Sequence, residues 1–156
     1  MKNLYSINVY RLFRSIMISA GCLSALSASA ALKITEIMPS NISTIISDKY
    51  DYNGYVEIYN DGEQVDLNGW TVTNEKEGKT DWTLRLSQSH VVKKGYNLLF
   101  FAKDDVAETQ GSSAANMNPL FIGTVSQKLT SDEGKLTLTN GSQTISIEYP
   151  KQYPHI

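Results

Sequence analysis

The sequence predicts an all-β protein, an antiparallel β-sandwich or barrel. Three observations lead to this prediction. Apolar and polar residues alternate with a period of two in most segments, which is typical of half-buried strands. Asn-Gly, Asp-Gly and Glu-Gly pairs stand between these segments, where residues that accept positive φ suit tight corners. After residue 30, no segment carries a convincing apolar stripe with the 3.6-residue period of a helix.

The predicted strands follow one another at short intervals. The first covers residues 32–37 and stops at Pro39, and the second covers 55–59, where Val56 and Ile58 alternate with Glu57. Further strands are predicted over residues 71–73, 82–86, 135–139 and 144–149. Each has one apolar side, so we expect each to have one buried face and one solvated face.

Residues 96–102 are different, because apolar side chains occupy both sides of the run. We predict a central strand that is covered on both faces; the alternative is a strand whose outer face meets something else. The long stretch 104–119 is expected to be a mobile surface loop with at most one short turn of helix. Corners are expected at Asn53-Gly54, Asp61-Gly62, Asn68-Gly69, Glu133-Gly134 and Asn140-Gly141.

The stretch 55–70, YVEIYNDGEQVDLNGW, predicts a compact corner between two strands. The chain turns at residues 61–62, Leu67 then points inward as a plug, and a second turn at 68–69 brings Trp70 into the core. A fully buried large apolar side chain contributes about 1.5–3 kcal/mol. We therefore expect Trp70 to be one of the main anchors of the core.

Residues 1–30 have the composition of an export signal. Positive charges occur at Lys2, Arg11 and Arg14, an apolar run follows, and Ala28-Ser29-Ala30 matches the A-x-A cleavage pattern. We predict a signal peptide over residues 1–30, a domain over 31–149 and a C-terminal tail or truncated linker over 150–156. The alternatives are a retained N-terminal anchor and lipoprotein processing at Cys22.

Cleavage after Ala30 would leave a monomeric exported protein in the periplasm, on the cell surface or outside the cell. It would hold no transmembrane segment and no cysteine. The leader carries three positive charges, so its loss changes the formal net charge from −2 to −5. The longest basic run left is Lys93-Lys94, and this excludes the clustered positive charge of a nucleic-acid-binding protein.

The ordered motifs resemble the lamin tail domain, especially its bacterial exported branch found next to spore-coat-kinase-like domains. The residues that carry the core of this resemblance are Glu57, Asn60, Gly62, Asp66, Leu67, Gly69 and Trp70. The resemblance covers nearly all of residues 32–149. It implies an immunoglobulin-like sandwich without catalytic residues, used for binding or attachment as an accessory domain. The tail 150–156 resembles a connector to a following domain, so a fragment is expected, with a frayed terminus as the alternative.

The sequence offers little for catalysis. His90 and His155 are the only histidines, and we expect His90 in a polar loop without an orienting partner. No G-x-S-x-G motif occurs. We therefore predict a protein that is not an enzyme and needs no cofactor, whose partner is an unidentified protein or polysaccharide.

Two local patterns suggest weaker binding hypotheses. Asp48, Asp51 and Asn53 are spaced like the start of a calcium loop, but Tyr59 stands where the closing glutamate is needed, so a solvated loop is favoured. Tyr50, Tyr52, Tyr55 and Tyr59 gather around the same stretch. Exposed tyrosines are favoured on binding surfaces, which suggests a carbohydrate-binding module as the alternative function, although ordinary strand composition also accounts for them.

Overall fold

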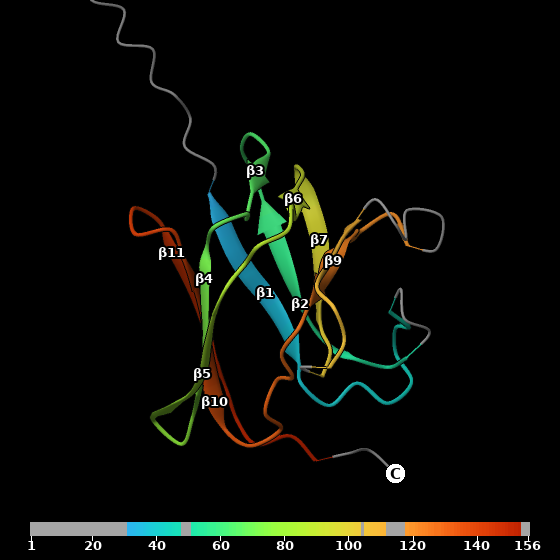
Figure 1. Cartoon of the computed structure of the whole chain (residues 1–156), viewed down its shortest axis with the longest axis vertical. Coiled ribbons are helices and arrows are strands. Elements are labelled where there is room, and N and C mark those ends of the chain that lie inside the picture. The colour runs from blue at the N-terminus through green and yellow to red at the C-terminus, as the bar shows by residue number, and fades with distance from the viewer. Residues whose placement is uncertain (1–30, 48–50, 104, 112–117, 154–156) are drawn as a thin grey trace, which may run out of the picture.

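The computed structural model describes residues 31–47, 51–103, 105–111 and 118–153. It confirms the predicted fold class, an all-β sandwich of immunoglobulin-like character (Figure 1). A five-stranded sheet has the order β1-β2-β7-β9-β8, a four-stranded sheet has the order β11-β10-β4-β5, and a small sheet pairs β3 with β6. The strands are β1 (Leu32–Met38), β2 (Gly54–Asn60), β3 (Val65–Asp66), β4 (Thr71–Lys76), β5 (Lys79–Arg85), β6 (Val91–Val92), β7 (Gly95–Phe101), β8 (Thr109–Gln110), β9 (Phe121–Val125), β10 (Gly134–Thr139) and β11 (Thr144–Tyr149).

The main core lies between the two large sheets. Val56 and Ile58 of β2 meet Val72 of β4 and Leu138 of β10 there, all with no exposed surface. Trp70 is 3% exposed and belongs to the same cluster. These inward positions are the ones that the period-two pattern predicts, since alternate side chains of a strand share a face.

From Asn97 to Phe101 the strand β7 is buried on both faces, as predicted, whereas Tyr96 near its start is exposed. Its inward residues Leu99 and Phe101 join the main core, whereas Leu98 and Phe100 belong to a second cluster on the outer face of the sheet. This second cluster is covered by Ile45, which belongs to the connection between β1 and β2, residues 39–53. The outer face of β7 therefore meets another part of the same chain.

One strand pair departs from the antiparallel prediction. β9 was not predicted, and it pairs with β7 in parallel, while β8 pairs with β9 antiparallel. A parallel pair needs a crossover of a dozen or more residues, which the chain between Phe101 and Phe121 supplies. The irregular stretch 104–119 is therefore largely this crossover, and its described part includes β8.

The expected corners are only partly correct. Gly141 has a φ of 92° in the β10–β11 hairpin, as expected for an Asn-Gly corner. Gly54 and Gly134 instead begin β2 and β10 without positive φ. An unpredicted corner at Glu77-Gly78, with φ of 50° and 75°, joins β4 to β5. Glycine adopts the positive φ of a turn at little energetic cost, but pairing with other strands decides whether the turn forms at that position.

The predicted leader 1–30, with Cys22 and the cleavage site, lies outside the described residues. So do residues 154–156 at the end of the predicted tail. Within the described ranges, no helix has the length and apolar character needed to cross a membrane.

Candidate functional site

The corner after β2 is held by the side chain of Asn60, which has no exposed surface. Its Oδ1 accepts a hydrogen bond from the Gly62 amide at 2.9 Å. Its Nδ2 donates to the carbonyls of Glu63, at 2.8 Å, and Val92, at 3.3 Å. Asn60 thus joins the turn to β6 and satisfies buried backbone groups, so its part in the motif is structural.

Leu67 and Trp70 close the second turn of the same corner. The Trp70 amide donates to the Leu67 carbonyl at 3.0 Å, and Gly69 has a φ of 81° at the third position. Positive φ at that position is the signature of a type II turn, which favours glycine. The Gly69 amide donates to the Leu86 carbonyl at 2.9 Å, and the Leu86 amide donates to the Trp70 carbonyl at 2.8 Å. The corner is therefore tied to the end of β5.

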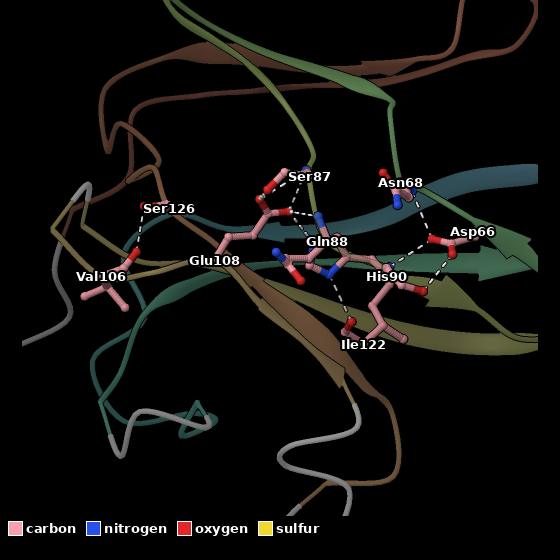
Figure 2. Close-up of polar contacts among 10 residues, drawn as sticks. Asp66, Asn68, Ser87, Gln88, His90, Val106, Glu108, Ile122 and Ser126 are labelled. Atoms are coloured by element: carbon pink, nitrogen blue, oxygen red, sulfur yellow. Dashed lines mark hydrogen bonds and ion pairs between the residues drawn. The ribbon is translucent and has the colours of Figure 1, made fainter.

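Asp66 connects the corner to the segment before β6 (Figure 2). Its carboxylate accepts hydrogen bonds from the amides of Asn68, at 2.9 Å, and His90, at 3.0 Å, and from the Ser89 hydroxyl at 2.6 Å. Burial by itself raises the pKa of Asp66, but these hydrogen bonds outweigh it and leave the pKa below its ordinary value. The charged carboxylate is the form that this corner stabilises.

His90 lies at the centre of the network and has no exposed surface. Its Nε2 is 2.8 Å from Oε1 of Glu108, and its Nδ1 is 3.1 Å from the Ile122 carbonyl oxygen. Gly123 leaves the space for the ring, because a Cβ there would lie 2.0 Å from Nδ1. The expectation of a polar loop without an orienting partner was wrong. The partners are 18 and 32 residues away, so no local pattern could reveal them.

Glu108 joins the crossover to the segment that follows β5. Its carboxylate accepts the Ser87 hydroxyl and the amides of Ser87 and Gln88, besides contacting His90. Burial by itself raises the pKa of Glu108. Hydrogen bonds from the Ser87 hydroxyl, His90 and the two amides lower the pKa by more than burial raises it, so the net shift is downward. The Ser87 hydroxyl donates to Glu108 and not to the imidazole. This arrangement differs from that of a nucleophile activated by a histidine, and it ties the crossover to the segment between β5 and β6.

The structure separates the tyrosines that the sequence groups together. Tyr55 is 2% exposed, and its hydroxyl donates to Oε1 of Glu36 at 3.0 Å. Burial first, and the neighbouring carboxylates after it, raise the pKa of Tyr55. Tyr55 is therefore part of the second core and not an exposed ligand-binding residue as expected. Tyr50 lies outside the described residues.

Tyr59 lies at the other end of β2, on the open part of the outer face. It pairs across the sheet with Lys33 of β1 and Tyr96 of β7. The two tyrosine rings are 4.9 Å apart between centroids, and the Lys33 ammonium is 5.1 Å from the centre of the Tyr59 ring. Tyr96 is 53% exposed. Beside them, the Glu57 carboxylate accepts the Thr35 hydroxyl at 2.7 Å. This row of Lys33, Tyr59 and Tyr96, the aromatic row, is a candidate contact surface.

Tyr52, Asp51 and Asn53 line a cleft at the end of the sandwich where β1 and β7 stop. Its volume is about 290 Å³, and its other lining residues are Pro39, Ser40, Asn41, Ile42, Gly54, Phe101, Lys103, Lys128, Leu129 and Ser131. Tyr52 is 44% exposed. The sequence suggested the first three residues as ligand candidates but gave no sign that 101–103 and 128–131 would complete the wall.

The described side chains give little support to the calcium hypothesis. Oδ1 of Asp51 accepts the Tyr52 amide at 2.8 Å, and Nδ2 of Asn53 donates to the Ser47 hydroxyl at 2.9 Å. Asp48 lies outside the described residues. Across the part of the chain that the structure describes, no three His, Cys, Asp or Glu side chains are grouped so that they could hold a metal ion.

Comparison with known proteins adds no relative: no protein-family model matches the chain, and no curated protein matches it.

Proposed function

We propose that the chain is a non-catalytic exported β-sandwich module for attachment or protein–protein interaction, an accessory domain of a larger protein. The aromatic row is the observation that carries the proposal. Tyrosines bring large contact area at a low entropy cost, and Tyr96 leaves more than half of its side chain open to solvent. A sheet face bearing such a row suits contact with a protein surface.

Two further points support the proposal. The resemblance to lamin tail domains implies an attachment role and an immunoglobulin-like sandwich, and the fold agrees with that implication; membership of the family stays a prediction. The polar groups with catalytic potential, His90, Glu108 and Ser87, bond to one another or to the backbone inside the corner. Groups used in this way serve stability, and surface recognition is the function left to the exposed residues.

Photo-crosslinking tests the attachment surface directly. The producing cell expresses the chain with a photoreactive phenylalanine analogue in place of Tyr96, and the exported fraction is irradiated. The matched control carries the same analogue at Ser146, which is exposed on the opposite sheet. We expect a discrete protein adduct at position 96 that weakens with Tyr59→Ala and is missing at position 146. Identical adducts at both positions, or none at position 96, would count against this surface.

The enzyme alternative has its own test. The purified chain is assayed against esters, phosphoesters and glycosides, and we expect no turnover. Activity that disappears in a His90→Gln variant with an unchanged circular dichroism spectrum would overturn the proposal.

A carbohydrate-binding module is the second candidate function, and one observation favours it. Tyr52 stands exposed at the edge of a cleft of about 290 Å³, close to the lower limit of about 300 Å³ for small-ligand pockets. Binding of a polysaccharide that is lost on Tyr52→Ala but kept on Tyr96→Ala would favour this candidate over attachment through the aromatic row.

A further inference from the structure

We propose that the cleft beside Tyr52 binds an anionic sugar unit, a pyranose that carries a carboxylate or a phosphate group. The inference rests on the carbohydrate-binding candidate and adds the charge of the ligand and the residues that select it. Three features of the cleft support it: a wall fixed by hydrogen bonds, an exposed aromatic ring, and an excess of positive charge.

Asn41 fixes the loop that carries Tyr52. Its Nδ2 donates to the carbonyls of Ile45 and Asn53, and its Oδ1 accepts the Thr44 amide at 3.0 Å. Asn41 is 6% exposed, so these bonds are shielded from water. Asn41 thereby ties residues 44–45 to Asn53, and a preformed wall loses less entropy when a ligand binds.

The part of the wall that holds Lys103 and Lys128 is fixed through the backbone. The Lys128 carbonyl accepts the Trp82 indole N–H at 2.9 Å, which ties this residue to β5. The Lys103 carbonyl accepts the Val106 amide at 3.0 Å. Both lysines are therefore anchored at the backbone, while their side chains remain exposed. Anchored backbones and free side chains are what a site needs to reach a charged ligand.

Tyr52 offers the apolar contact that sugars use. Aromatic rings at binding sites combine large apolar area with a polar tip. The Tyr52 side chain is 44% exposed, unlike Tyr55 three residues later. A pyranose lying against this ring would have its substituents directed toward the polar groups of the wall.

The charge of the wall selects the anion. Two of the lining residues, Lys103 and Lys128, are basic, and Asp51 is the one acid among them. Neither lysine forms an ion pair with a carboxylate of the described residues. The Asp51 carboxylate accepts the Tyr52 amide, which occupies part of it. A wall with two basic residues and one acidic residue favours an anionic ligand over a neutral one.

The test compares ligands that differ only in charge. Calorimetric titration of the purified chain uses tetragalacturonate, its methyl ester, a phosphorylated mannan and the matching neutral mannan. We expect one of the two anionic probes to bind at least roughly tenfold more tightly than its neutral partner, and binding to weaken on raising the salt concentration. The carboxylate and phosphate arms identify which anion the cleft prefers.

Variants locate the site. Tyr52→Ala, Lys103→Gln and Lys128→Gln should each weaken binding of the anionic probe by about fivefold or more, because each removes one expected contact. Lys94→Gln is the matched control and should leave the affinity unchanged, because this exposed lysine directly precedes β7, at the end of that strand away from the cleft. Thermal unfolding of each variant confirms that the fold is intact.

The outcomes separate the two levels of the proposal. Equal binding of charged and neutral probes, lost on Tyr52→Ala but kept in both lysine variants, would overturn the anionic inference and leave the carbohydrate candidate standing. No binding of any probe would overturn both. Neither result touches the crosslink expected at position 96, which tests attachment through the aromatic row.

Discussion

The corner around His90 and the cleft beside Tyr52 are both built where loops meet at the edges of the sandwich, yet they differ in what their polar groups do. In the corner, His90, Glu108 and Asp66 find partners on neighbouring loops, and the imidazole is shut off from solvent. In the cleft, Tyr52 and two lysines line an open surface. Polar side chains thus serve stability in the corner, where the fold supplies them with partners, and stay open to solvent in the cleft.

The same lesson applies within one strand. Tyr55 and Tyr59 point to the same face of β2, but only Tyr55 is covered, because the 39–53 connection brings Ile45 over the second core cluster. Changes in the corner should therefore lower stability, and changes in the cleft should leave stability intact while altering binding.

The largest effect is expected from Gly123→Ala in the corner. The new Cβ would lie 2.0 Å from Nδ1 of His90 and 2.5 Å from the Thr109 carbonyl oxygen, at a φ of 146°. We expect a loss of about 4 kcal/mol or more, measured by urea unfolding. Gly141→Ala is the matched control, since its φ is 92° but nothing lies within 4 Å, and it should cost only about 1 kcal/mol. Equal losses would show that His90 does not fill this space.

Removing the carboxylate partner of His90 should have the next largest effect. Glu108→Ala leaves the buried imidazole without the partner of Nε2 and frees the amides of Ser87 and Gln88. We expect a loss of about 3 kcal/mol in chemical denaturation, as for other broken buried pairs. Glu148→Ala, whose side chain is 80% exposed, should change stability by less than about 1 kcal/mol. A loss for Glu108→Ala no larger than for this control would contradict the structural role of the network.

Acid should weaken the corner more gently. The folded pKa values of Asp66 and Glu108 lie below the ordinary 3.8 and 4.5, so the unfolded chain takes up these protons first as the pH falls. Their stabilising contribution is complete above those ordinary values and is lost as the pH falls through the folded values. The urea midpoint should therefore drop on going from about pH 6 to about pH 3. A double variant, Asp66→Asn with Glu108→Gln, should start lower and show a flatter dependence; an identical slope would rule out these two groups.

The smallest change in stability is expected in the cleft. Tyr52→Ala removes an exposed ring and should alter the free energy of unfolding by no more than about 0.5 kcal/mol. Tyr55→Ala, at the covered end of the same stretch, should cost about 3 kcal/mol because it leaves a cavity in the second core cluster. Thermal unfolding of the two variants side by side measures the difference, and similar losses would mean that the two tyrosines are equally covered.

Much of the fold could be predicted, because strands with one buried face show alternating apolar and polar residues in the sequence. β9 escaped prediction for physical reasons. It is only five residues long, contains a glycine, is buried throughout, and pairs in parallel with a strand reached through a long crossover. The burial of Leu67 and Trp70 in the corner was predicted correctly. Of the residues that line the cleft, the sequence suggested only those of its 51–53 wall as ligand candidates.

The sequence alone determines the layered β architecture, the burial of Trp70 and the shape of its corner. These features depend on the period of apolar and polar residues and on turns of a few residues. The tertiary structure decided which tyrosine is covered, which carboxylate meets His90 and which lysines stand beside Tyr52. Those contacts join segments far apart in the chain, and their formation depends on how two packed sheets bring the loops together, which local sequence does not encode.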